Sequence, residues 1–229
     1  MLVPVVNKAV FYRAVSNLLK QFDAAGLRVR RGEKFEELEA LVERDGLKHQ
    51  LTEHFKTALN TFTPATAFWL ALENDHGCLV AIIAARLDDL GHMSLRGWWE
   101  KYWRRCYPGL NDELLVMAAD QPTFAECISG RIVYLGELIV AEPLQSGGIG
   151  GALTQLAQLD ALQEWRPDYI YGWVRPAAGA ERGRRACGFR REYPQPIRWV
   201  NPPKTIDGDL SVVLNSYHET LDLMADTAR

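Results

Sequence analysis

The stretch AEPLQSGGIGGAL, residues 141–153, decides the fold because it joins a predicted strand to a predicted helix through four glycines. Residues 131–140 form an apolar, strand-like run, and residues 150–165 have apolar positions at helical spacing. Glycines permit positive φ and let a ligand approach the main chain, while the free amides and dipole of the first helical turn favour a phosphate. The stretch therefore indicates an anion site. The alternative is that the glycines only form a tight turn or pack the helix closely on the sheet.

Two common phosphate motifs do not fit this turn. A nucleotide P-loop ends in Gly-Lys-Ser or Gly-Lys-Thr, where this chain has Gly-Gly-Ala. A dinucleotide fingerprint that begins at Gly148 requires a third glycine at the position of Leu153. The pattern that does match is Gln/Arg-x-x-Gly-x-Gly/Ala, supplied by Gln145, Gly148 and Gly150.

With this pattern the sequence resembles the GNAT superfamily of acyl-CoA N-acyltransferases, over about residues 131–193. The strand that ends in Leu138-Ile139-Val140 and the later Gly188-Phe189 pair add to the resemblance. It implies an α/β (α+β) fold with a mixed, mostly antiparallel central sheet flanked by helices. It also implies acetyl-CoA as the acyl donor, no metal, and direct attack by a primary amine of a small molecule or protein. A non-catalytic acyl-CoA-binding module is the alternative, and a phosphate-binding protein of another class is a third.

The resemblance assigns the contacts to coenzyme A mainly to the backbone. The end of the strand would pair with the pantetheine arm, the glycine turn would hold the pyrophosphate, and the amide of Leu138 would polarise the thioester carbonyl. The implied contacts are Leu138, Ile139, Val140, Gln145, Ser146, Gly147, Gly148, Ile149, Gly150 and Gly151.

Proton removal is assigned to Glu137 or Tyr134. An aliphatic amine, with a pKa of about 10.4, arrives protonated at neutral pH and must lose a proton before it attacks. Glu137 is next to the expected oxyanion donor, whereas Tyr134 occupies the position where some family members have a catalytic glutamate. A bulge in the strand would change which of the two faces the substrate. The alternative for Glu137 is an exposed or salt-bridged strand residue.

The chain departs from the family pattern at two positions. Arg184 stands where a tyrosine often protonates the departing thiolate, and Ala177 stands where asparagine is common. A cation at Arg184 could stabilise the thiolate; we favour instead a member of a solvated basic cluster, residues 182–185, or a contact to a coenzyme A phosphate. The five histidines show no metal-ligand spacing, so none is assigned to a metal or to catalysis.

The order of elements predicts one domain, residues 1–229, with a core and coenzyme A site at 66–200, a helical insertion at 88–120 and a C-terminal strand and helix at 209–229. Helices are predicted at 8–22, at 33–62 with a break at Asp45-Gly46, at 111–119, 178–187 and 217–228. Strands are predicted at 66–73 and 78–87, joined as a hairpin, and at 168–174, from 189 onward, and at 209–215. An aromatic helix is predicted at 94–107; its Trp98–Trp103 part would line the acceptor pocket, belong to the core or form a homodimer contact.

Composition narrows the choice of partners. The net charge of -3 and a sequence pI near 6.0 give no basic excess for nucleic acid. The sequence shows no secretory signal and no apolar run of about 20 residues, so we expect no membrane partner and a cytoplasmic protein. The four cysteines lie far apart without a Cys-x-x-Cys pair, which is typical of free thiols in a reducing compartment.

Overall fold

The structure, a computed structural model, describes residues 5–175, 184–206 and 210–229. Its helices are α1 Lys8–Ala24, α2 Phe35–Arg44, α3 Leu95–Cys106, α4 Ile149–Trp165 and α6 Tyr217–Thr227. Its strands are β1 Arg28–Gly32, β2 Ala67–Glu73, β3 Leu79–Asp89, β4 Val116–Met117, β5 Arg131–Val140, β6 Tyr169–Val174, β7 Arg191–Tyr193, β8 Trp199–Asn201 and β9 Ser211–Ser216. Short 3-10 helices lie at Leu110–Asp112, Thr123–Cys127 and Glu142–Gly147.

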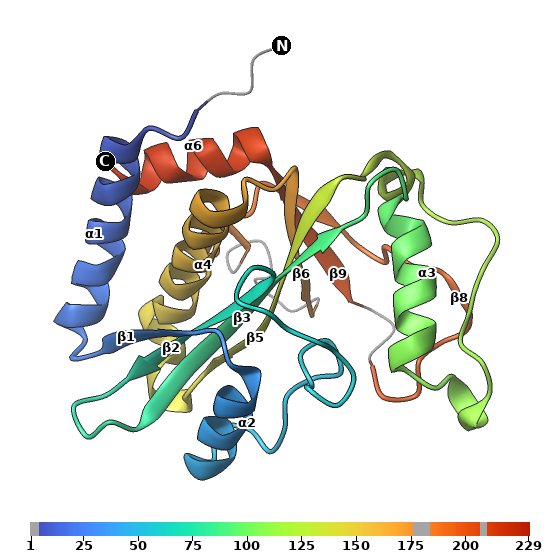
Figure 1. Ribbon diagram of the computed structural model, residues 1–229, viewed down its shortest axis with the longest axis horizontal. Coiled ribbons are helices and arrows are strands. Elements are labelled where there is room, and N and C mark those ends of the chain that lie inside the picture. The colour runs from blue at the N-terminus through green and yellow to red at the C-terminus, as the bar shows by residue number, and fades with distance from the viewer. Residues whose placement is uncertain (1–4, 176–183, 207–209) are drawn as a thin grey trace.

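Seven strands form one twisted sheet in the order β1-β2-β3-β5-β6-β9-β7 (Figure 1). Strands β5 and β6 pair in parallel, and the other neighbouring pairs are antiparallel. The prediction of a mixed, mostly antiparallel sheet is therefore confirmed. Strands β4 and β8 form a separate two-stranded sheet beside α3.

Both faces of the sheet are covered by helices. Successive side chains of each strand point to opposite faces, so each strand contributes to both cores. Helices α1, α4 and α6 pack against one another (Figure 1). Their core includes Phe68 and Leu135. On the other face α2 and α3 pack over a second core that includes Trp69 and Tyr134. Residues 67–72 of β2 are accordingly all buried. The two cores meet at the sheet, where the site described below lies.

Several local predictions are confirmed. The hairpin of β2 and β3 turns at Asn74–Gly77, where the Asn74 side chain accepts hydrogen bonds from the amides of His76 and Cys78. Strand β5 has the predicted bounds, and α4 begins one residue before its predicted start. The aromatic helix α3 begins after Ser94, whose Oγ caps the amide of Gly97. The closing helix α6 begins with a capping box of Ser216 and Glu219.

The prediction of a second helix up to residue 62 is wrong, and strand β1 was not predicted. After α2 the chain forms short turns, although its apolar spacing is helical. The amides of Thr52 and Thr57 bond to the side chains of Glu137 and Glu39, at 2.8 and 3.0 Å, so they are not donated to helix carbonyls. The two carboxylates lie 85 and 18 residues away in the sequence, and local periodicity does not reveal them.

The prediction of a helix at 111–119 is also wrong. Asn111 and Asp112 have φ of 58 and 60°, in the left-handed region that an α-helix does not contain. The chain then forms β4, and the amide of Ala118 bonds to the carbonyl of Arg198 near β8. The predicted insertion at 88–120 is therefore α-helical only in α3.

Two further predictions fall partly outside the described residues. Of the helix predicted at 178–187, residues 184–186 are helical, and residues 178–183 and Ala177 lie outside the described part. Strand β9 begins at Ser211, while residue 209 lies outside.

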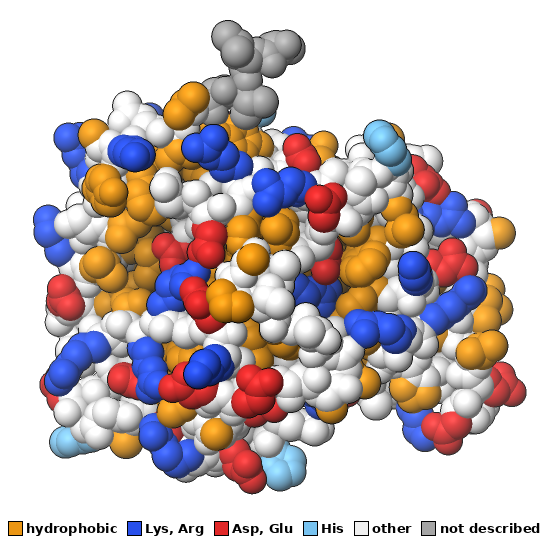
Figure 2. Space-filling model, in the orientation of Figure 1, with side chains coloured by type: hydrophobic (Ala, Val, Ile, Leu, Met, Phe, Trp, Pro, Cys, Tyr) orange, Lys and Arg blue, Asp and Glu red, His pale blue; other side chains and the backbone are white. Residues whose placement is uncertain are grey.

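On the face shown in Figure 2, acidic and basic side chains are interleaved, which agrees with the small net charge. Within 5–175, 184–206 and 210–229, no helix is long and apolar enough to cross a bilayer.

Candidate functional site

A cleft opens where β5 and β6 stop pairing. Their parallel register runs from Ile132 opposite Tyr169 to Leu135 opposite Gly172, and the described strands do not pair beyond it. From this point residues 136–139 and 172–175 line a cleft of about 420 Å³. Strands that separate leave backbone groups free to bond a ligand. The cleft reaches residues of both cores, so it joins the α4 side of the sheet to the α3 side.

A β-bulge in β5 lies at the mouth of this cleft. Across the pair, Gly136 faces Ala84 and Ile139 faces Ile82, so two residues of β5 oppose Ile83 alone. Glu137 in the bulge has a φ of 58°. Regular alternation would put Glu137 on the α4 face with Leu135. The bulge turns it toward the α3 face, where Tyr134 also lies.

The Glu137 carboxylate is enclosed by three donors. Lys48 Nζ lies 2.7 Å from Oε2, the amide of Thr52 lies 2.8 Å from Oε1, and the Thr52 hydroxyl also donates to Oε1. The Glu137 side chain has no exposed surface. The salt-bridged state considered from the sequence is therefore the one found, and a role in proton transfer stays a prediction.

Tyr134 is buried between aromatic rings, with centroid distances of 5.5 Å to Phe55 and 4.8 Å to His54. Burial, with Tyr171 and Glu137 nearby, raises the pKa of Tyr134 well above its usual value. The hydroxyl thus stays protonated at neutral pH and is a donor rather than a base. It lies beside Gly136, where a Cβ would come within 2.7 Å of the Tyr134 oxygen. Gly136 therefore makes room for this hydroxyl.

His54 lines the cleft, although sequence reasoning assigned no histidine to a site. Its ring stacks on Tyr102 at 5.2 Å, and its Nδ1 has no hydrogen-bond partner among the described residues. Burial, together with the cations Arg86 and Arg105, lowers the pKa of His54 well below its usual value, so the ring is neutral. The sequence contains no spacing that identifies it, because its neighbours come from α3 and β5.

The glycine turn leaves backbone amides without helix partners at the start of α4. Gly148 has a φ of 74° and closes the 3-10 helix before α4 begins. The first α4 bond runs from the amide of Ala152 to the carbonyl of Gly148. The amides of Ile149, Gly150 and Gly151 therefore have no helix carbonyl to bond.

The glycines of this turn also have structural reasons. A Cβ at Gly151 would lie 2.7 Å from the Ala186 carbonyl oxygen, and one at Gly150 would lie 3.1 Å from Val140 Cγ2. Gln145, Ser146 and Gly147 are exposed, and the Gln145 side chain donates to the Val140 carbonyl at 3.0 Å. That bond ties the turn to the end of β5. Close packing of the glycines and amides without a helix partner thus occur together here, and an anion site stays a prediction.

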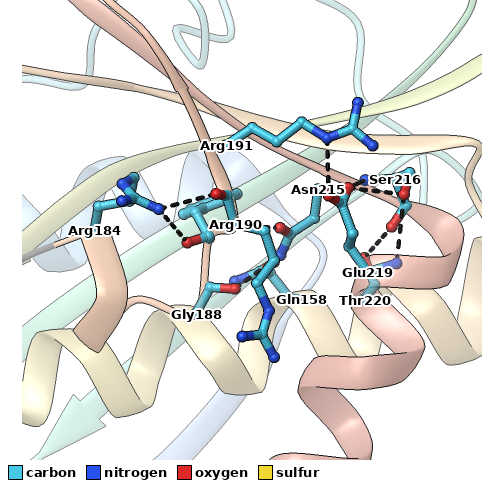
Figure 3. Close-up of polar contacts among 10 residues, drawn as sticks. Gln158, Arg184, Gly188, Arg190, Arg191, Asn215, Ser216, Glu219 and Thr220 are labelled. Atoms are coloured by element: carbon cyan, nitrogen blue, oxygen red, sulfur yellow. Dashed lines mark hydrogen bonds and ion pairs between the residues drawn. The ribbon is translucent and has the colours of Figure 1, made fainter. Parts of the chain in front are cut away.

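Arg184 lines the cleft and belongs to a network of hydrogen bonds (Figure 3). Its Nη1 donates to the carbonyls of Phe189 and Arg190 at 3.1 and 3.0 Å, and its Nε lies 3.3 Å from Glu192. Its side chain is only 16% exposed, so the interpretation of Arg184 as a solvated cation is wrong.

Asn215 holds the neighbouring turn in the same network (Figure 3). Its amide donates to Gln158 Oε1 at 2.8 Å and to the Gly188 carbonyl at 2.9 Å. Its Oδ1 accepts from the amide of Arg190 at 2.8 Å. These bonds fix the segment that places Phe189 in the wall of the cleft.

The aromatic helix contributes a wall rather than the whole site. Trp99, Tyr102 and Trp103 are buried in the core under α3. Trp103, with Tyr107 just after the helix, also lines the cleft. The core alternative is therefore the one found for α3, and an acceptor pocket at Trp103 stays a prediction.

No protein-family model matches the sequence, and no curated protein is detectably similar to it. Among solved structures, a mutant agmatine N-acetyltransferase in its apo form is 14% identical with a TM-score of 0.50, over 83% of this chain and 99% of that one. Arabidopsis thaliana NAA60 with acetyl-CoA is 15% identical with a TM-score of 0.49, over 83% and 98%. The similarity to the agmatine N-acetyltransferase, together with the strand order, shows the fold of this chain. At 14% identity it shows the fold alone. This chain has the fold of the GNAT N-acetyltransferases.

Proposed function

We propose that the protein is an N-acetyltransferase, which transfers an acetyl group from acetyl-CoA to a primary amine of a small molecule or protein. The observation that carries the proposal is the cleft between β5 and β6. It joins the α4 side of the sheet, where its lining includes Thr154, to a buried carboxylate and a protonated tyrosine on the other side. A donor and an acceptor can thus meet from opposite faces of the sheet.

Acetyl-CoA would bind mainly through backbone groups. The amides of residues 149–151 suit the pyrophosphate, since a helix N-terminus favours an anion. The exposed end of β5 suits the pantetheine arm. Leu138 lies in the bulge without a partner in the β3 register, so its amide is the proposed donor to the thioester oxygen.

The acceptor would lose a proton and then attack the thioester carbon. In this proposal Glu137 takes up the first proton of the aminium group. The nitrogen-carbon bond forms, the carbon-sulfur bond breaks, and coenzyme A departs as a thiolate. The corresponding thiol has a pKa of about 8.5. The Tyr134 hydroxyl is the proposed proton donor to this thiolate, and Tyr134 takes up in return the second proton, which the nitrogen loses as the amide forms.

The acceptor class is part of the proposal. The structural neighbours include N-acetyltransferases whose names specify agmatine and spermidine. We therefore propose amines of small molecules first, with a protein amine as the alternative.

The direct test combines acetyl-CoA with a panel of amines and measures free thiol and the acetylated product. We expect amine-dependent release of coenzyme A. A non-catalytic acyl-CoA-binding module is the second candidate, favoured by an Arg184 tied to backbone carbonyls and a Glu137 carboxylate without exposed surface. Calorimetric binding of acetyl-CoA without turnover of any amine would support that module and exclude the enzyme for the amines used.

A further inference from the structure

We infer that Thr52 is a further catalytic residue, whose hydroxyl relays the proton from the acceptor amine to Glu137. The inference rests on the proposed function, in which Glu137 is the proton acceptor. It follows from how the carboxylate is covered. The Glu137 side chain has no exposed surface, although the residue belongs to the lining of the cleft. An amine in the cleft therefore reaches the carboxylate only through a neighbouring group.

Three described groups contact the carboxylate oxygens: Lys48 Nζ, the Thr52 amide and the Thr52 hydroxyl. An ammonium group has three donors and no lone pair, and a backbone amide nitrogen accepts no hydrogen bond. A hydroxyl has one donor and two acceptor sites. Of the three, only the Thr52 hydroxyl can accept a proton from an amine while it passes its own proton to Glu137.

The position of Thr52 suits this role. It is half-buried and lines the cleft next to His54, and its neighbour Leu51 is buried. Its carbonyl accepts hydrogen bonds from the amides of Phe55 and Lys56 at 2.8 and 2.9 Å, which closes a tight turn. Because the Thr52 hydroxyl donates to Glu137, its lone pairs remain for a donor in the cleft.

The transfer is balanced in protons. The aminium nitrogen gives one proton to Thr52 Oγ1, and the hydroxyl proton of Thr52 moves to Glu137. The threonine is unchanged, the amine is neutral and ready to attack, and Glu137 is protonated. After acetyl transfer the proton returns from Glu137 through the same hydroxyl to solvent.

The chain offers a matched control for the structural part of this contact. Thr57 bonds Glu39 through the same two groups, with its amide 3.0 Å from Oε1 and its hydroxyl 2.9 Å from Oε2, whereas both groups of Thr52 bond Oε1 of Glu137. Thr57 does not belong to the described lining of the cleft. Loss of the Thr57 hydroxyl therefore measures how much such a threonine–carboxylate contact contributes to stability. Thr57 has no proton to relay in the proposed mechanism.

The test compares Thr52→Val, Thr52→Ser and Thr57→Val in steady-state acetylation between neutral and alkaline pH, with thermal unfolding of each variant. Thr52→Val keeps the amide bond to Glu137 and loses the hydroxyl. We expect its turnover at neutral pH to fall about 100-fold, within the range for a lost acid-base group, and to recover as pH rises and free amine becomes available. Thr52→Ser should stay within a few-fold of the parent protein, and Thr57→Val should lose stability but not turnover.

A double variant adds a second readout. If Thr52 and Glu137 act as one relay, Thr52→Val should reduce turnover little further in a Glu137→Gln background. Folded Thr52→Val with near-parent turnover, or with a loss that is the same at every pH, would overturn the relay while leaving the enzyme proposal intact. A Thr52→Ser variant as impaired as Thr52→Val would overturn it too. A parent protein that binds acetyl-CoA and acetylates no amine would overturn both proposals.

Discussion

Replacement of Gly148 by alanine should weaken acetyl-CoA binding through the backbone alone. Gly148 has a φ of 74°, and nothing lies within 4 Å of the Cβ that alanine would add. The cost is therefore conformational strain, about 1–2 kcal/mol for an L-residue in the left-handed region. If the turn relaxes to escape that strain, the amides of residues 149–151 lose the orientation that we propose for binding the pyrophosphate.

The same strain can be created away from the turn. Gly77, in the hairpin of β2 and β3, has a φ of 72° and also has nothing within 4 Å of an added Cβ. Gly77→Ala should lower the free energy of unfolding by a similar amount, about 1–2 kcal/mol, because the φ angles of the two glycines are nearly the same. It does not touch the proposed coenzyme A site, so it separates lost stability from lost binding.

Calorimetry with acetyl-CoA, desulfo-CoA and ATP measures the effect. In the parent protein the two coenzyme A forms should bind comparably and ATP should bind little, since the thioester adds little anchoring. Gly148→Ala should raise both dissociation constants about tenfold, because 1.4 kcal/mol corresponds to a factor of ten. Gly77→Ala should leave them unchanged. Equal binding by both variants would refute our view of the turn, and a parent protein that binds neither coenzyme A form would remove the basis of the proposed function.

Three more predictions concern the acceptor side of the cleft. Glu137→Gln should lower turnover at neutral pH about 100-fold, keep acetyl-CoA affinity and be partly rescued at high pH, as measured by pH-rate profiles. Trp103→Ala should change the relative kcat/KM values of different amines more than the KM for acetyl-CoA. Trp99 is outside the described cleft lining, so Trp99→Ala should only lower the free energy of unfolding, by about 3–5 kcal/mol, as measured by urea unfolding. The pKa of His54 is lowered in the folded protein, so the free energy of unfolding should decrease as the pH falls below 6.5, the ordinary pKa of histidine. His54→Phe should reduce this decrease between pH 7.5 and 5.5, as measured by urea titrations.

The sequence was most informative where structure depends on neighbours along the chain. Strand β5, the glycine turn and α4 follow one another, and each carries its own pattern of apolar residues or glycines. The hairpin turn at Asn74 and the cap at Ser94 likewise depend on side chains that bond two to four residues away. Sequence patterns therefore located the proposed donor half of the site.

The acceptor half was poorly predicted because it is built by distant residues. Thr52 leaves its helical pattern to bond Glu137, which lies 85 residues further along the chain. His54 becomes a cleft residue through rings from α3 and β5. Arg184, in a basic run, is a different case, because its partners are only five to eight residues away, in the turn and strand that follow it. None of these contacts has a local spacing that reveals it.

The bulge at Glu137 connects these two halves. If position 137 served only to form the bulge, glycine or asparagine would be favoured at its φ of 58°. A glutamate in this left-handed conformation costs about 1–2 kcal/mol of backbone strain. Strain of this kind persists where the surrounding contacts fix the residue, and it is concentrated at functional sites. Here the contacts of the carboxylate with Lys48 and Thr52 hold the residue in place. One strained residue thus interrupts the β3 register at Leu138, where we place the oxyanion donor, and turns a carboxylate toward the other face, where we place the amine. A glycine could supply the first effect but not the second, and for this reason we assign Glu137 to the chemistry rather than to the bulge alone.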